Sequence, residues 1–278
     1  VQQVMDLAGV AHLSAIKSRI PFLHWFDGFR TSHEIQKVEA LEYSDLAKLV
    51  DYDALHAWKK GAMNPESPSL RSTVQNPDIY FQVREANNQD YAALADIVEG
   101  YMAEISKLVG REYHPFNYYG AVDADRVIIA MGSACETAQE VVDRLNADGE
   151  KVVQVFLYRP FSVKHLLDVI PASVKKIAAL DRLKEAGSIG DPLYEDICSA
   201  YNEVTGEKPI IVGGRYGLSS KDTDPACIKA VFDNLKLDEP KNHFTIGIVD
   251  DVTHMSLELD KDFQVEDSST ISCKFWGL

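Results

Sequence analysis

The chain has 278 residues, 46% hydrophobic and 26% charged, which are the proportions of a globular protein long enough for one large or two ordinary domains. Its 28 basic and 43 acidic residues give a net charge of −15, which repels nucleic-acid phosphates, so nucleic acid is not an expected partner. No apolar run approaches the roughly 20 residues that span a bilayer, and the first residues do not resemble a signal peptide. We therefore expect a cytoplasmic protein that does not bind membranes.

The four cysteines are widely dispersed, and none forms the Cys-x-x-Cys pair that zinc or iron–sulfur sites normally need. We expect four buried free thiols in a reducing cytoplasm, rather than disulfides. They are Cys135, Cys198, Cys227 and Cys273.

The first half of the chain predicts three helices, with extended and looping segments between them. Apolar residues at helical spacing predict a helix from Val1 to about Lys17, and the apolar run Pro21–Phe26 predicts a buried strand. Ser32–Glu34 is typical of the cap of a following helix. Three X-Pro steps within residues 64–78 favour a loop over a helix, and a long amphipathic helix is expected from about Asp90 to Val109.

From Asp123 onward, the pattern alternates between strands and helices. This alternation predicts a parallel sheet with helices on both faces, in a domain over Asp123–Leu237. The expected strands are Arg126–Ser133, Val152–Leu157, Lys176–Leu180, Pro209–Val212, Phe244–Ile248 and Thr270–Trp276, and the expected helices are Ala134–Leu145, Val163–Val169, Asp191–Val204 and Asp224–Asn234.

A series of short motifs carries a resemblance to one family. In chain order they are His24–Lys37, Gln75–Gln82, Met131–Ser133, Leu157–Phe161, Gly190–Tyr194, Gly214–Leu218, Lys241–Thr245 and Phe275–Leu278. Each motif is short, but their common order is very specific. In these motifs the chain resembles pyruvate:ferredoxin (flavodoxin) oxidoreductase, over nearly its whole length.

The resemblance implies an α/β fold of parallel sheets flanked by helices, in three parts. Residues 1–120 resemble the late part of the domain that holds the thiamine pyrimidine, residues 121–240 a transketolase C-terminal-like domain, and residues 241–278 the start of a third domain. The family's enzymes convert pyruvate to acetyl-CoA and CO₂, using thiamine pyrophosphate, Mg²⁺, [4Fe-4S] clusters and CoA, and pass electrons to ferredoxin or flavodoxin. The remaining domains of the enzyme, a second subunit of a homodimer, and ferredoxin or flavodoxin are the implied partners.

The resemblance also implies that this stretch is an internal fragment that lacks the main chemical groups. The family's Gly-Asp-Gly thiamine motif and its clustered cysteines do not occur, and its pyruvate-binding residues belong to a segment before Val1. We expect no catalytic residue, no bound cofactor or metal, and no activity in the isolated chain. Apolar surface that other domains cover is expected to make the isolated chain self-associate.

Four polar residues are candidates for the surroundings of the thiamine or pyruvate pocket. Arg30, Thr31, Ser32 and His33 follow the predicted strand Pro21–Phe26, and ligands bind at the carboxyl ends of such strands. The alternative is that they cap the next helix and bond to loop carbonyls. A metal site built from His24, Asp27, His33 and Glu34 is not expected, because their spacing matches no standard motif.

Two arginines are candidates for contacts between domains. Arg159 lies in an aromatic motif, and Arg and aromatic side chains dominate interfaces. Arg215 follows a strand in a glycine-rich loop, where it suits an ion pair with a neighbouring domain or, alternatively, a phosphate or carboxylate ligand. Met131–Ser133 suits either a phosphate site or, more simply, a tight turn from strand to helix.

Two other functions remain open from the sequence alone. One is a freestanding Rossmann-like binding or interaction module, which the incomplete glycine patterns disfavour. The other is a related oxidoreductase that acts on a different 2-oxoacid.

Overall fold

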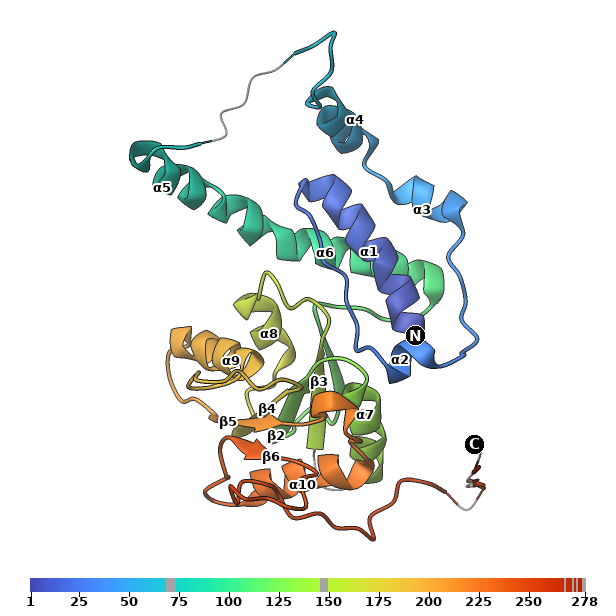
Figure 1. The fold of residues 1–278 in the computed structure, drawn as a ribbon, viewed down its shortest axis with the longest axis vertical. Helices are drawn as coiled ribbons and strands as arrows, with labels where there is room; N and C mark the ends of the chain where they lie inside the picture. Colours follow the sequence, from blue (N-terminus) through green and yellow to red (C-terminus); the bar gives the residue numbers. More distant parts are fainter. Residues whose placement is uncertain (69–73, 146–149, 268, 272, 274, 277–278) are drawn as a thin grey trace. The chain divides into compact units, whose positions relative to one another are not determined.

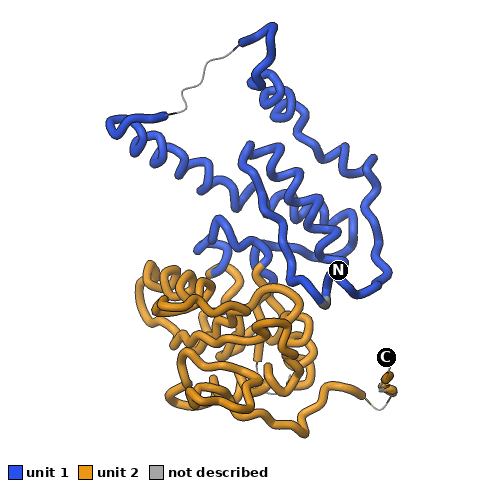
Figure 2. The backbone as a smooth tube through the Cα atoms, in the orientation of Figure 1, with its two compact units in different colours: residues 1–117, 156–166 blue, residues 118–155, 167–278 orange. Residues whose placement is uncertain are grey.

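The structure is a computed structural model that describes residues 1–68, 74–145, 150–267, 269–271, 273 and 275–276. The chain divides into two compact units, which are coloured separately in Figure 2. Unit 1 comprises Val1–Asn117 and Phe156–Leu166, and unit 2 comprises Tyr118–Val155 and Leu167–Leu278. No described helix is both long and apolar enough to cross a membrane.

Unit 1 is helical, and its core lies between its first and its longest helix. Its helices are α1 (Gln2–Ser18), α2 (Arg30–His33), α3 (Tyr43–Leu49), α4 (Tyr52–Lys60), α5 (Pro77–Ala86) and α6 (Asn88–Val109). α1 packs against α6, burying Val10, Leu13, Leu94, Val98 and Ile105 (Figure 1). The expected helices over 1–17 and 90–109 are confirmed, and α6 ends at Gly110, which adopts the left-handed conformation at φ 67°.

The strand expected over Pro21–Phe26 is wrong. The segment pairs with no described strand, and the side chains of Leu23 and Trp25 are 85% and 54% exposed. An apolar run indicates burial, but a strand also needs a neighbour that accepts and donates its backbone hydrogen bonds. The helix expected after Ser32–Glu34 is also wrong, because Ser32 and His33 lie inside the single turn of α2 and residues 34–42 are irregular.

Of the loop expected over residues 64–78, positions 69–73 lie outside the described residues, and the rest is correct only as far as Asn76. Pro77 is the first residue of α5, where its missing N–H costs nothing because first-turn N–H groups have no partner within the helix. α3 and α4 were not predicted, because neither buries a residue that would mark an apolar face.

The predicted parallel sheet is confirmed, and within the described residues it has six strands, in the order β1-β3-β2-β4-β5-β6. The pairs β2–β3, β2–β4, β4–β5 and β5–β6 are all parallel, with Ile128 opposite both Val152 and Ala178, and Ala178 opposite Val212. The strands are β1 (Phe116–Gly120), β2 (Arg126–Ala130), β3 (Glu150–Val155), β4 (Lys176–Asp181), β5 (Ile210–Arg215) and β6 (Phe244–Thr245).

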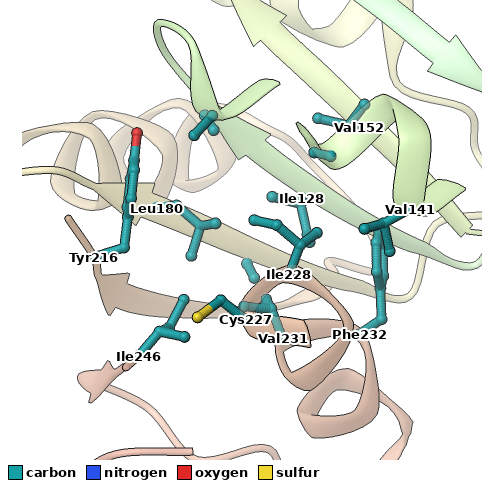
Figure 3. Close-up of a cluster of buried hydrophobic side chains, with 14 of the residues drawn as sticks. Ile128, Val141, Val152, Leu180, Tyr216, Cys227, Ile228, Val231, Phe232 and Ile246 are labelled. Carbon is teal, nitrogen blue, oxygen red and sulfur yellow. The ribbon is translucent and has the colours of Figure 1, made fainter. Parts of the chain in front are cut away.

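The helices that were expected between these strands are also confirmed. They are α7 (Ala134–Leu145), α8 (Val163–Val169), α9 (Pro192–Glu203) and α10 (Pro225–Lys236), with a short 3₁₀ helix η1 at Leu218–Ser220. α7 and α10 pack together over one face of the sheet, where Ile128 and Leu180 contact the α10 residues Ile228 and Val231 (Figure 3). α9 contacts β4 and β5.

The end of the chain differs from expectation. β6 covers only Phe244–Thr245 of the strand expected over Phe244–Ile248. Two residues of the strand expected over Thr270–Trp276, at positions 272 and 274, lie outside the described residues, and the others form no strand. Exposed apolar side chains such as Ile271 and Phe275 show that an apolar composition alone was misleading here.

All four cysteines are free, as expected, but they are not all buried. Cys135 and Cys227 lie in the core of unit 2, whereas Cys198 is half-buried and Cys273 is exposed. Cys273 follows the last strand and lies outside the packed core, so the expectation that all four are buried is wrong.

The core of unit 2 contains a buried lysine. Lys151 on β3 is fully buried, and its Nζ lies 3.7 Å from the centroid of the Tyr118 ring without a hydrogen-bond partner among the described residues. Burial lowers the pKa of this ammonium group to about 8.

We expect Lys151→Met to raise the free energy of unfolding by about 2 kcal/mol at pH 7, because it fills the same space without a buried charge. Between pH 8 and 10.5, the unfolded wild-type chain holds the Lys151 proton that the folded chain has lost, so wild-type stability rises with pH there. The gain of the variant should therefore shrink to near zero above pH 10.5. Denaturant titrations at pH 7, 9 and 11 measure it, and a gain that does not change with pH would contradict this account.

Candidate functional site

The candidate pocket residues lie on one turn of unit 1. Phe29 has a φ of 58°, and α2 begins directly after it. Ser32 Oγ donates to the Phe29 carbonyl at 3.1 Å, and His33 Nδ1 lies 2.5 Å from the same oxygen. Thr31 Oγ1 donates to Asp27 Oδ2 at 2.9 Å. The backbone of Arg30 opens the helix, and its side chain lies outside the described residues.

These contacts favour the plainer of the two interpretations of the turn. The Thr31, Ser32 and His33 side chains bond to groups of the turn itself, as the alternative of local capping predicts. Ser32 and His33 are also exposed. A role around the thiamine or pyruvate pocket stays a prediction for all four residues.

The histidine that precedes this turn is shifted toward its neutral form. Burial lowers the pKa of His24, and the charge of His12 on α1 lowers it further. Among the described residues, no group of three or more His, Cys, Asp or Glu side chains is placed to hold a metal ion.

Sequence reasoning missed a buried carboxylate on α1. Asp6 is fully buried and accepts hydrogen bonds from Arg111 Nε at 2.8 Å, from the Tyr113 hydroxyl at 2.7 Å and from Gln2 Nε2 at 2.9 Å. Arg111 Nη1 also bonds to Glu39 Oε2 at 2.8 Å. This cluster joins α1 to the segments that follow α2 and α6.

The charges of this cluster explain its pKa shifts. Burial and the Asp6 carboxylate raise the pKa of Tyr113, and hydrogen bonds to Asp6 and Glu39 raise the pKa of Arg111. The signal in the sequence was an acidic residue on the apolar face of a helix, since Asp6 shares its face with Val10 and Leu13. An acid in that position needs a buried partner.

A second set of polar residues lies at the carboxyl ends of β4 and β5 in unit 2. Arg215 Nε donates to Asp191 Oδ2 at 2.6 Å. Asp181, which is buried, accepts hydrogen bonds from the backbone N–H groups of Leu193 and Tyr194 at 3.0 and 3.2 Å. Burial raises the pKa of Asp181. These carboxylates hold the start of α9 in place.

The ion-pair partner of Arg215 therefore lies in the same unit, and the pair ties the end of β5 to the N-cap of α9. Arg159 is exposed and turns onto its neighbour, with Nη1 donating to the Tyr158 carbonyl at 3.0 Å and the guanidinium 4.0 Å from the Tyr158 ring centroid. A role of either arginine between domains stays a prediction.

The glycines near Arg215 allow aromatic rings to lie directly on the strand. A Cβ on Gly213 would lie 2.9 Å from Cγ of Tyr194, and a Cβ on Gly214 would overlap the ring of Phe244. At the end of β2, Gly132 has a φ of 77° and the Tyr216 hydroxyl donates to the Met131 carbonyl at 3.1 Å. Packing and turn formation thus account for glycine patterns that resemble phosphate loops.

One hollow in unit 1 does not suit a diphosphate group by itself. A hollow of about 200 Å³ in unit 1 is lined by Glu39, Glu42 and Asp45 as well as Leu41, Leu108 and Arg111. Its three carboxylates would repel a diphosphate.

We expect Tyr113→Phe to lower the free energy of unfolding by about 2 kcal/mol, because it removes a buried hydrogen bond to a charged acceptor. Tyr119→Phe is the matched control. Its hydroxyl also bonds to a carboxylate, Asp143, at 2.8 Å, but in an exposed position, so the loss should stay below about 0.5 kcal/mol. Equal losses of unfolding free energy in denaturant titrations of the two variants would mean that the burial of Asp6 does not strengthen its hydrogen bond with Tyr113.

We expect Gly214→Ala to cost about 3 kcal/mol of stability, because Phe244 is fully buried and cannot move away from the new methyl group. In a Phe244→Ala background, the same substitution should cost less than about 1 kcal/mol. Thermal unfolding of the four proteins of this double-mutant cycle measures the coupling. A cost of Gly214→Ala that is unchanged without the Phe244 ring would contradict the overlap.

Comparison with known proteins identifies the family. A model described as pyruvate flavodoxin/ferredoxin oxidoreductase, thiamine diphosphate-binding, matches residues 1–103, and one described as pyruvate:ferredoxin oxidoreductase core domain II matches residues 124–225. Pyruvate-flavodoxin oxidoreductase of Enterobacter agglomerans is 60% identical and pyruvate:ferredoxin oxidoreductase of Moorella thermoacetica 56% identical, each across all of this chain and 24% of the relative.

A solved 2-oxoglutarate:ferredoxin oxidoreductase of Magnetococcus marinus aligns with 63% of this chain and 25% of its own, at 18% identity and a TM-score of 0.34, which is too low to bear on the fold. The chain spans about a quarter of the length of the curated relatives that it matches. With two family models matched in order and identities of 56–60% from end to end, the chain belongs to the pyruvate:flavodoxin/ferredoxin oxidoreductase family.

Proposed function

We propose that this chain is part of a larger, thiamine diphosphate-dependent enzyme that oxidatively decarboxylates pyruvate to acetyl-CoA and CO₂ and passes the electrons to ferredoxin or flavodoxin. The observation that carries the proposal is the 60% identity to a pyruvate-flavodoxin oxidoreductase across the whole chain. Mg²⁺, [4Fe-4S] clusters and CoA belong to the proposal for the larger enzyme, as do a homodimer and a cytoplasmic location, where free cysteines stay reduced.

Within that enzyme, we assign a supporting role to this segment. The polar side chains at the candidate turn bond to groups of the turn itself, and the carboxylates of unit 2 hold the start of a helix. The sheet of unit 2 is a fully packed core, with Val127, Ile128, Ile129 and Ile177 completely buried. Because these polar groups hold a turn and a helix start in place, we assign them to the support of the fold and not to the making and breaking of bonds.

The test uses the full-length polypeptide that contains these residues, assayed without oxygen. We expect methyl viologen to be reduced only when both pyruvate and CoA are present, whereas the 278-residue chain alone should reduce none. The kcat/KM for 2-oxoglutarate and for 2-oxobutyrate should be at least about tenfold lower than for pyruvate. The reason is that the relatives that align with the whole chain are named for pyruvate.

Each outcome of this assay bears on one part of the proposal. If the full-length protein fails to reduce viologen with every 2-oxoacid tested, the proposed activity is wrong. A higher kcat/KM with another 2-oxoacid would reassign the substrate. A native product no longer than this chain, measured by intact mass, would favour the freestanding binding module instead.

A further inference from the structure

One long helical rod in unit 1 has an apolar stripe that its partner covers only in part. α5 and α6 are joined at Asn87, which keeps a right-handed helical conformation at φ −69° and ψ −14°. The Asn87 carbonyl accepts the first hydrogen bonds of α6, from the backbone N–H groups of Asp90 and Tyr91, so α6 begins directly where α5 ends. Residues 77–109 therefore form a nearly continuous rod (Figure 1).

The stripe has the same spacing along the whole rod. In the second half, Leu94, Val98, Met102 and Ile105 are buried, three or four residues apart. Going back in the same steps leads to Tyr91, Asn87, Val83 and then Tyr80 and Ile79. The apolar residues of this first half are exposed, Ile79 by 49%, Tyr80 by 53%, Val83 by 40% and Tyr91 by 46%.

The difference between the two halves follows from length. α1, which packs against α6, has 17 residues and is about 25 Å long, whereas the 33 residues of the rod span about 50 Å. α1 can therefore cover only about half of the stripe. No residue of α5 is buried. Four large apolar side chains in one row on a helix normally face a partner.

We propose that residues 77–93 dock, through the stripe formed by Ile79, Tyr80, Val83 and Tyr91, on an apolar surface of the same longer polypeptide that lies outside these 278 residues. This rests on the proposed function, in which the chain is part of a larger enzyme. The relatives supply the room for such a surface, because this chain spans 24% of their length. A partner on the same polypeptide is also held at a high local concentration.

The charges beside the stripe set the chemistry of the surface that receives it. The charged residues of the docking segment are Asp78, Arg84, Glu85 and Asp90, three acidic and one basic, and the whole chain carries −15. At helical spacing, Asp78 and Glu85 lie on the same side as Phe81, opposite the stripe, whereas Arg84 and Asp90 lie beside it. The surface that receives the stripe therefore has an apolar centre, with an acidic group opposite Arg84 and a basic group opposite Asp90.

Hydrogen exchange in the full-length polypeptide tests the docking. We expect the amides of residues 77–93 to exchange at least about 100-fold more slowly than in an unstructured peptide, as those of residues 94–109 do, and to keep this protection on tenfold dilution. Val83→Asp should speed exchange of residues 77–93 about tenfold. Phe81→Asp is the matched control, because it adds the same charge on the opposite side of the helix, and should change exchange less than twofold.

The outcomes separate this proposal from its rivals. Fast exchange of residues 77–93 in the wild-type protein, or equal effects of the two variants, would overturn it. Protection that is lost on dilution would show that a second copy occupies the stripe, which also overturns it. Peptides from α7 and α10 in the same experiment report whether each variant is folded.

The viologen assay on the same preparation keeps the two proposals apart. An active enzyme in which residues 77–93 exchange fast would count against the docking alone. A protected segment in a protein that oxidises no 2-oxoacid would count against the proposed function alone.

Discussion

The parallel sheet of unit 2 must bury both of its faces. Most of the helices and strands that could be predicted from the sequence follow from this constraint. Parallel strands are joined by crossovers that place helices on the sheet, so their side chains find apolar contacts on either side. β2 illustrates the result, since Val127, Ile128 and Ile129 are all completely buried although they point alternately to opposite faces. Such strands appear in the sequence as uninterrupted β-branched runs, which few other structures produce.

For this reason the sequence predicted unit 2 far better than unit 1. α7 and α8 lie at the expected residues, and the other helices and central strands of unit 2 differ from expectation by only a few positions. In unit 1, the apolar run Pro21–Phe26 has the composition of a buried strand but no described strand beside it. A local pattern indicates that a segment favours a buried strand, but it does not show whether a second strand lies beside it to form the backbone hydrogen bonds. The helices α3 and α4 were not predicted for a related reason, because neither has a buried face.

The candidate site shows a similar division. Residue types placed Thr31, Ser32 and His33 together correctly, because they are adjacent, but the groups to which they bond were decided by the left-handed conformation of Phe29, which no pattern predicted. Long-range partners were out of reach: Asp6 and Arg111 are 105 residues apart. The glycines at 213 and 214 were noticed, yet their cause is the Tyr194 and Phe244 rings, which approach from other elements. The sequence drew attention to the glycines but not to Asp6, and only the fold revealed the partners of both.

The exposed apolar surface is unevenly distributed, and this unevenness bears on what the segment does. A domain that works alone closes its apolar surface, as the core of unit 2 does between its sheet and α7 and α10. In unit 1, the region between α1 and α6 is equally well packed, and Ile105 there is completely buried. Other parts of the same unit leave many large apolar side chains exposed. Exposing Leu23, Trp25, Phe26 and Phe29 to water gives up burial worth roughly 1.5–3 kcal/mol for each large side chain. A sequence that carries this cost at many positions is better explained by covering surfaces elsewhere in a larger enzyme than by a function that the chain performs alone.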